Sequence, residues 1–222
     1  MKINCKKTQL IMISPPNGYD NKSYITVGSE RINSKSDLKL LGFVFGSEPN
    51  VSRHVEEIKK KFRSRFWSLI HLRRAGIKGS ELLSLFNVFL RPVIEYCSIV
   101  YHSMLTAGQS DELERLQKQV IKLAFGWDRN YAAVCAEQDI STLKERRENH
   151  LDHFIHKSIQ SERFGELWFP RRELATHNIR DRKPFKETKA RTARYFNSPL
   201  SYMRRRANQL YAEYNETEDL MD

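Results

Sequence analysis

Three histidines recur at every third position, His150, His153 and His156. On an α-helix, residues three or four positions apart share a face, so two of these imidazoles could bind one metal ion. The third would lie well round the helix, and no cysteine is close to them in the sequence. The spacing therefore favours surface histidines over a metal site.

Acidic residues cluster at two places, Glu56-Glu57 and Asp111-Glu112-Glu114. Both lie at or near the predicted starts of helices, where carboxylates offset the helix dipole. The sequence contains no Y-x-D-D motif, no pattern typical of a Ser/His/Asp triad and no glycine-rich phosphate loop. The pattern thus predicts structural acids and gives no catalytic residue.

The strongest chemical signal is positive charge. The chain of 222 residues has a formal net charge of +11, and its sequence pI is about 9.6. A surplus of that size favours a polyanionic partner, nucleic acid or an anionic membrane surface, over an uninvolved basic surface.

Two basic stretches are the candidates for such binding. The predicted helix from Val51 carries Lys59, Lys60 and Arg63 opposite its apolar residues. The segment Arg163 to Arg206 holds thirteen Lys and Arg against four Asp and Glu, with aromatic residues interspersed. Cations neutralise phosphates and aromatic rings can stack bases, although plain solvation would also explain the helix face. The candidates in the segment are Arg171, Arg172, Arg191, Arg204 and Arg205.

Cys5, Cys97 and Cys135 are an odd, sparse set without a CxxC pair, which argues against a disulfide framework and a zinc knuckle. A reducing, intracellular compartment is expected, nucleus or cytoplasm. The longest apolar-rich run, residues 82–105, is interrupted by charged residues. Charges at mid-depth predict a buried helix there and no membrane partner.

The elements that must position these residues change character along the chain. Short apolar runs predict strands at 9–14, 23–27 and 38–45, the last with Gly42 inside it. Apolar residues then recur at helical spacing. The predicted helix signals are a stop at Gly76, an N-cap at Ser80, a kink at Pro92, an N-cap at Ser110, a stop at Gly126, a capping box at Thr142-x-x-Glu145 and a start at Ser198-Pro199.

Strands followed by helices predict an α+β fold that is mostly α, with a small antiparallel β part and a helical bundle. The composition suggests four regions: 1–50 with strands, 51–160 helical, 161–212 a basic arm with a terminal helix, and 213–222 an acidic tail. The tail has five acids and no bases, so it is expected to be disordered.

Six short segments follow one another in a recognisable order. They are Asn4-Cys5-Lys6-Lys7-Thr8, Lys39-Leu40-Leu41-Gly42-Phe43, Arg91-Pro92-Val93-Ile94-Glu95-Tyr96-Cys97-Ser98, Leu113-Glu114-Arg115-Leu116-Gln117-Lys118, Leu143-Lys144-Glu145-Arg146-Arg147 and Ser198-Pro199-Leu200. They resemble the N-x-x-K-T, K-Y-L-G, R-P-x-x-E-Y-x-S, L-E-x-x-Q-K, L-x-x-R-R and S-P-L elements of non-LTR retrotransposon reverse transcriptases of the LINE and jockey type. The third is the most specific, because an internal proline beside paired Arg and Glu is unusual in a helix. Leu40 replaces the family's tyrosine.

The resemblance spans residues 3 to 208. It implies a C-terminal fragment: a partial palm with a primer-grip-like hairpin at 1–50, a thumb-like domain at 51–160 and a connection region. It also implies that Lys7 lies near the incoming triphosphate and that Lys39 and Gly42 belong to the primer grip. The implied partners are RNA/DNA primer–template and the N-terminal palm and fingers, with no small-molecule substrate.

Intact members of this family hold Mg²⁺ with palm aspartates that precede the position of Asn4, and none of the three predicted strands contains an acid. We therefore expect no cofactor on this chain and no polymerase activity from it alone. It would be a truncated RNA-directed DNA polymerase that binds primer–template. The alternatives are a host-retained, non-catalytic RNA- or DNA-binding module and an interaction protein with no nucleic-acid role.

Overall fold

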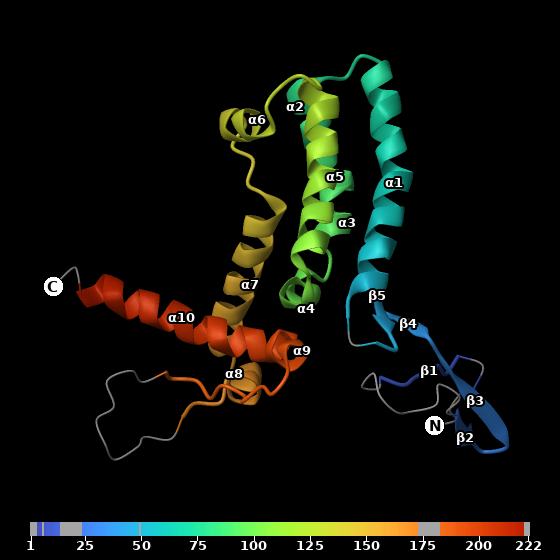
Figure 1. The fold of residues 1–222 in the computed structure, drawn as a ribbon, viewed down its shortest axis with the longest axis vertical. Coiled ribbons are helices and arrows are strands. Elements are labelled where there is room, and N and C mark those ends of the chain that lie inside the picture. The colour runs from blue at the N-terminus through green and yellow to red at the C-terminus, as the bar shows by residue number, and fades with distance from the viewer. Residues whose placement is uncertain (1–3, 6, 14–23, 49, 173–182, 220–222) are drawn as a thin grey trace. The chain divides into compact units, whose positions relative to one another are not determined.

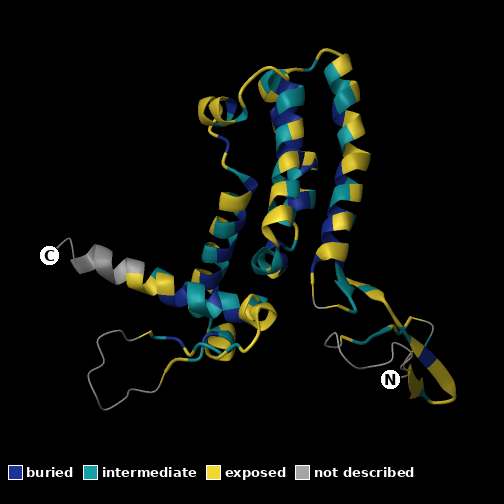
Figure 2. Ribbon diagram, viewed as in Figure 1, coloured by how far each residue is buried: buried dark blue, intermediate teal, exposed yellow. Residues whose placement is uncertain are grey.

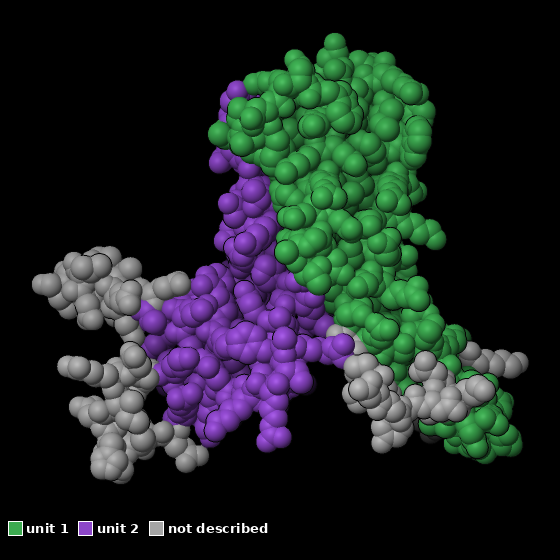
Figure 3. Space-filling view, viewed as in Figure 1, with its two compact units in different colours: residues 1–96, 106–136 green, residues 97–105, 137–222 purple. Residues whose placement is uncertain are grey.

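The computed structural model describes residues 4–5, 7–13, 24–48, 50–172 and 183–219, with side chains described as far as residue 212. The described chain is mostly helical with two small sheets, which confirms the predicted α+β class (Figure 1). It divides into two units, coloured separately in Figure 3: residues 1–96 with 106–136, and residues 97–105 with 137–222. The predicted boundaries near 50 and 160 differ from this division, because elements on both sides of each boundary pack together.

Among its described residues, the first unit has five short strands. They are β1 (Leu10–Ile11), β2 (Tyr24–Val27), β3 (Glu30–Lys35), β4 (Asp37–Leu40) and β5 (Phe43–Gly46). β3 is central in the first sheet, antiparallel to β2 and parallel to β1, and β4 with β5 forms a separate antiparallel hairpin. The prediction of an antiparallel β part is therefore corrected for the β1–β3 pair.

Three features of these strands differ from the sequence patterns. The run 38–45 is not one strand but the β4–β5 hairpin, because the chain reverses at Leu41-Gly42. β3 has no run of apolar residues, and Ile32 is its one buried residue. Acids also occur on strands, contrary to expectation, with Glu30 opening β3 and Asp37 opening β4.

The helices of the first unit are α1 (Ser52–Arg74), α2 (Gly79–Phe89), α3 (Arg91–Glu95), α5 (Ala107–Phe125) and α6 (Tyr131–Glu137). α1, α2 and α5 pack against one another, and their buried faces make the core (Figure 2). The core side chains include Val55, Ile58, Phe62, Leu69, Leu82, Phe86, Leu113, Val120 and Ile121. Helical spacing of the apolar residues is what places them on one face of each helix.

Helix boundaries follow the sequence signals only in part. Gly126 caps the end of α5 as predicted. Thr106, not Ser110, begins α5, because Thr106 and Gln109 form a capping box one turn earlier. α2 begins at Gly79, with Lys78 as its N-cap and no side-chain cap. The prediction of Ser80 as the N-cap is therefore wrong.

The predicted kink at Pro92 is a complete break. α2 ends at Phe89, and α3 starts at Arg91 with proline in its first turn. Proline has no N–H to donate, so it suits a first turn and not a helix interior. The break separates the α2 core helix from the segment that ends in Tyr96.

The second unit contains α4 (Ser98–Tyr101), the 3₁₀ turn η1 (His102–Met104), α7 (Leu143–Ile159), α8 (Glu162–Trp168), α9 (Ala193–Phe196) and α10 (Pro199–Asp219). The capping box of Thr142 and Glu145 at α7 and the start of α10 at Pro199 are as predicted. The unit's apolar cluster comprises Leu151, Ile155, Phe169, Phe185, Met203 and Ala207.

That cluster corrects the prediction of a basic arm at 161–212. Phe169 and Phe185 are buried against α7 and α10, so the described part of the segment is packed rather than extended. The backbone of residues 213–219 continues α10, where a disordered tail was expected. Both differences arise because scattered apolar residues without periodicity still find a common core.

Candidate nucleic-acid interface

The tip of the β4–β5 hairpin is a two-residue turn of left-handed backbone. Leu40 pairs with Phe43, and the two residues between them, Leu41 and Gly42, have φ values of 48° and 87°. Positive φ at both turn positions matches the twist of a hairpin, but a non-glycine residue adopts it at a cost. Leu41 adopts it while its side chain is 84% exposed. The hairpin thus holds an apolar side chain out in solvent.

Tyr96, just beyond α3, stabilises this turn. Its hydroxyl donates a hydrogen bond to the carbonyl oxygen of Leu41. A Cβ added at Gly42 would lie 3.0 Å from Cε1 of the Tyr96 ring. The structure therefore brings together two segments with family resemblance, 39–43 and 91–98, and explains why glycine suits position 42.

His54 links the hairpin to the start of α1. The backbone N–H of Val44 donates to its Nδ1 at 3.4 Å, and its ring lies 4.2 Å from the Phe43 ring. Burial, and then the nearby Lys61 ammonium, lower the pKa of His54 to about 4. The imidazole is therefore neutral near pH 7 and can accept that bond.

Two predicted binding residues near the start of α1, Lys39 and Lys59, differ in exposure and in the number of acidic side chains that they contact. Lys39 is exposed but lies 3.4 Å from the Glu57 carboxylate. Lys59 is only 15% exposed and contacts Glu56 at 2.7 Å and Glu112 at 3.0 Å. Hydrogen bonds to these two acids raise the pKa of Lys59. Lys59 thus forms an ion pair between α1 and α5, and its role as a phosphate ligand stays a prediction.

The exposed side of α1 carries a different set, named here the α1 exposed face: Arg53, Lys60, Arg63, Trp67, His71 and Arg74. Their spacing of seven, three, four, four and three residues places them on one side of the helix. The exposed Glu56 lies on the same side between Arg53 and Lys60, with its carboxylate 2.7 Å from Lys59. From Ile58 to the end of α1 there are seven Lys and Arg and no acid. Trp67 is 59% exposed, although tryptophan is usually largely buried.

Lys60 and Arg63 were predicted to bind, whereas Trp67 was not. Its one signal in the sequence is the four-residue spacing from Arg63. A ring between cations on one helix face offers both phosphate neutralisation and an apolar surface for a base or sugar.

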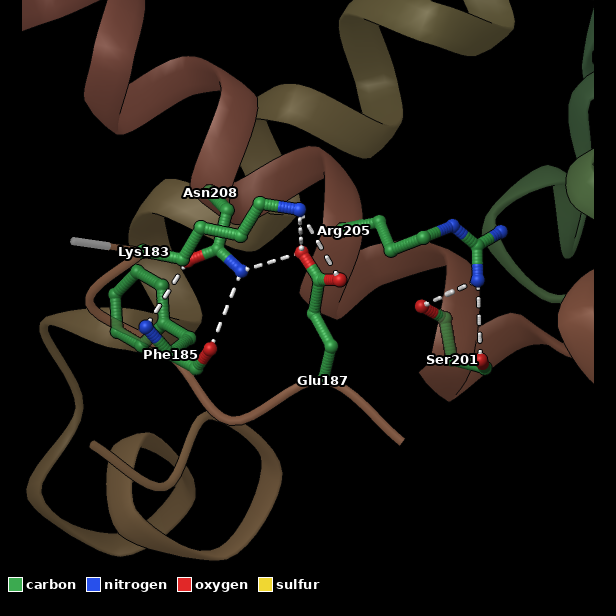
Figure 4. Close-up of polar contacts among 6 residues, drawn as sticks. All are labelled: Lys183, Phe185, Glu187, Ser201, Arg205 and Asn208. Atoms are coloured by element: carbon green, nitrogen blue, oxygen red, sulfur yellow. Dashed lines mark hydrogen bonds and ion pairs between the residues drawn. The ribbon is translucent and has the colours of Figure 1, made fainter. Parts of the chain in front are cut away.

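In the second unit, two predicted binding residues, Arg204 and Arg205, make contacts with other residues of the fold. Arg204 donates from Nε to the carbonyl oxygen of Trp168 at 2.7 Å, tying α10 to α8. Arg205 lies over the Phe196 ring at 3.4 Å and donates to Ser201 (Figure 4). Burial lowers the pKa of Arg205 slightly from its usual range, and it remains a cation.

Arg171, Arg172 and Arg191 are exposed, as a binding role requires. Residues 170–172 pair with residues 184–186, and this pairing is named here the clasp. In it, the Arg172 N–H donates to Pro184 O and the Lys186 N–H donates to Pro170 O, each at 2.9 Å. Residues 173–182, between the two sides of the clasp, lie outside the described residues.

Two polar residues that the sequence patterns missed, Arg206 and Asn208, join segments of this unit. Arg206 makes a bidentate contact with Asp152, at 2.9 and 2.7 Å, between α10 and α7. The buried Asn208 side chain pairs with both the N–H and the carbonyl oxygen of Phe185 and also donates to Glu187 (Figure 4). No local pattern identifies them, because their partners lie far away in sequence.

The remaining segments with family resemblance have packing roles. Gln117 is buried and donates to the Tyr131 hydroxyl, which itself donates to Glu114 at 2.6 Å. Burial and that bond raise the pKa of Tyr131 well above its usual range. Burial of the His102 ring, and then the nearby Arg147 guanidinium, lower the pKa of His102 to about 4. Arg147 is itself buried.

Lys7 is exposed in a turn, where its N–H donates to the Asn4 carbonyl oxygen at 3.0 Å. On α7, His153 and His156 border a cleft of about 600 Å³ that Arg171 and Tyr211 also line. Within the described ranges, no three His, Cys, Asp or Glu side chains form a group that could hold a metal ion.

Among the described residues, no single helix is both long and apolar enough to cross a membrane. The bent pair Gly79–Glu95 and Ser98–Met104 meets that test only when taken together, and by length and composition alone.

Comparisons with known proteins give no match for this chain. No family model matches it, and no curated protein and no solved structure matches it either. The functional conclusion therefore depends on the residues and their geometry.

Proposed function

We propose that this chain binds primer–template nucleic acid as a C-terminal portion of a non-LTR retrotransposon reverse transcriptase. The observation that carries the proposal is the α1 exposed face, where Lys60 and Arg63 precede the exposed Trp67 and Arg74 follows it. The order of the six segments with family resemblance supports primer–template as the polyanion. The chain has no Y-x-D-D sequence, so its proposed role is binding without polymerisation.

The dimensions of this face suit a nucleic-acid duplex. From Arg53 to Arg74 the face extends for about 32 Å at 1.5 Å per residue, which is roughly nine base pairs. Each phosphate that a cation neutralises releases counterions and strengthens binding at low salt. The hairpin, which hydrogen bonds join to Tyr96 and His54, precedes α1 in the chain. Lys39, Gly42 and Lys7 remain proposed contacts on the primer side.

The test is fluorescence anisotropy of an RNA–DNA primer–template at several salt concentrations. The double variant Lys60→Gln/Arg63→Gln should bind more weakly, and its slope of log K against log salt should fall by about two, one for each lost phosphate contact. The matched control is Lys144→Gln/Lys157→Gln, which removes two exposed cations from α7 at the same change in net charge. The control should bind nearly as the parent chain does.

Three results would contradict this proposal. They are binding that does not weaken with salt, equal loss in both double variants, and template-dependent incorporation of nucleotides by the chain alone. The last would require metal ligands outside the described residues.

A further inference from the structure

A second basic surface lies in the second unit, between the clasp and α10. Residues 183–198 contain five Lys and Arg and one acid, Glu187. That acid is engaged within the unit, 3.1 Å from Lys183 and 2.9 Å from the Asn208 amide (Figure 4). Lys189, Arg191 and Arg194 are exposed. The surface is therefore positive, with its single carboxylate already occupied.

Two consecutive aromatic residues follow these cations in the chain. Tyr195 and Phe196 on α9 are 49% and 48% exposed. Burying a ring of this size from water is favourable, so leaving two neighbouring rings half-exposed forgoes stabilisation of the fold. Exposed rings next to cations are the combination that binds unpaired bases together with their phosphates.

The backbone that carries the rings is held by local hydrogen bonds. The Thr192 hydroxyl accepts from the Tyr195 N–H at 3.2 Å, and the Ser198 hydroxyl donates to the Tyr195 carbonyl oxygen at 2.7 Å. The Phe196 N–H donates to Thr192 O at 2.9 Å. Rings presented on an ordered turn lose less conformational freedom on binding than rings on a loose chain.

Arg205 adds a fixed cation to Phe196. Its guanidinium lies 3.4 Å from the centroid of that ring and is held by the hydroxyl and carbonyl oxygens of Ser201, at 3.1 and 3.2 Å. A guanidinium covers one face of a ring and leaves the opposite face, and Phe196 keeps about half its surface exposed. A base can therefore stack on the uncovered face.

We propose that this surface binds single-stranded polynucleotide: Tyr195 and Phe196 stack unpaired bases, and Lys189, Arg191 and Arg194 bind the intervening phosphates. A duplex is a poor ligand here, because its base faces are already stacked on one another. The proposal goes beyond the function proposed for α1, since it uses no residue of the first unit. RNA and DNA strands share the recognised chemistry.

The experiment compares three labelled ligands on the whole chain: an oligo-uridine, an oligo-thymidine and a blunt duplex of equal length. Tyr195→Ala should weaken binding of both single strands about tenfold, which is within the range for loss of one stacked base. It should leave duplex binding unchanged. Arg191→Gln/Arg194→Gln should weaken single-strand binding and lower its salt slope by about 1.4. Neither variant disturbs the contact between Arg205 and Phe196.

The control is Tyr211→Ala, which removes a tyrosine of similar exposure from α10 of the same unit. Equal loss in the control, unchanged single-strand binding in both variants, or binding to anionic vesicles in place of oligonucleotides would overturn the proposal. Preference for one oligonucleotide names the strand, and equal binding supports recognition of the shared chemistry.

Lys60→Gln/Arg63→Gln separates the two proposals. Duplex binding lost in that variant, with single-strand binding retained, supports both surfaces. Single-strand binding that is sensitive to Tyr195→Ala, in a chain that never binds duplex, supports this surface and rejects the function proposed for α1.

Discussion

At the scale of single residues, Gly42 shows how a hairpin turn and a distant tyrosine constrain one position. Its φ of 87° belongs to the left-handed region, and a side chain there would meet the Tyr96 ring. Gly42→Ala should lower the free energy of unfolding by roughly 1–3 kcal/mol, from backbone strain and the close contact. Urea unfolding followed by circular dichroism measures this change.

Gly108 in the first turn of α5 provides the control. Nothing lies within 4 Å of a Cβ added there, and its backbone is helical. Gly108→Ala should therefore stabilise the chain by up to about 1 kcal/mol, because alanine is the better helix former. Equal effects of the two substitutions would show that the contact between Tyr96 and the hairpin tip does not constrain position 42.

At the scale of elements, helix stability depends on caps that can be compared directly. The Thr142 hydroxyl accepts from the Glu145 N–H at 3.1 Å, and the Glu145 side chain accepts from the Thr142 N–H at 3.0 Å. Thr142→Ala should cost about 1 kcal/mol, since a backbone donor loses its partner. Ser80→Ala should change stability by less than about 0.5 kcal/mol, because Ser80 lies inside α2 and caps nothing.

These two variants distinguish the sequence pattern from the structure. The sequence predicts both residues as N-caps, so by pattern alone both substitutions would weaken a helix. Thermal unfolding of the two variants beside the parent chain gives the comparison. A loss at Ser80 as large as that at Thr142 would place the start of α2 at Glu81, two residues later than described.

At the scale of the whole molecule, each unit contains one neutral histidine with a depressed pKa, His54 in the first and His102 in the second. Each pKa is lowered from 6.5 to about 4, with burial as the main cause. The unfolded chain therefore binds more protons between about pH 6.5 and pH 4, and the free energy of unfolding falls as the pH falls through that window. Stability should be full near pH 7 and reduced at pH 4.

His54→Gln tests the contribution of the first unit. Glutamine keeps a neutral acceptor for the Val44 N–H and cannot be protonated. The variant should lose less stability between pH 7 and pH 4.5 than the parent chain, by on the order of 1–3 kcal/mol. Parallel pH profiles for the two chains would show that His54 does not titrate on unfolding. Chemical denaturation at each pH provides the measurement.

The sequence by itself determined the helical part of this protein. The three- and four-residue spacing of Val55, Ile58 and Phe62 fixes which face of α1 is buried, and the box of Thr142 and Glu145 fixes where α7 begins. Pro199 likewise marks the start of α10. These features are local, since a helix closes its hydrogen bonds within a few residues. The net charge, and so the expectation of a polyanionic partner, is also a property of the sequence.

Only the tertiary structure decided which charges and rings are available for that partner. Lys59 and Arg204 look like phosphate ligands in sequence, but Glu112 and the carbonyl oxygen of Trp168 engage them. Trp67, which the sequence patterns did not single out, and Tyr195 both remain exposed. The difference is physical: their neighbours lie tens of residues away in the chain, and no local spacing encodes a contact between distant segments.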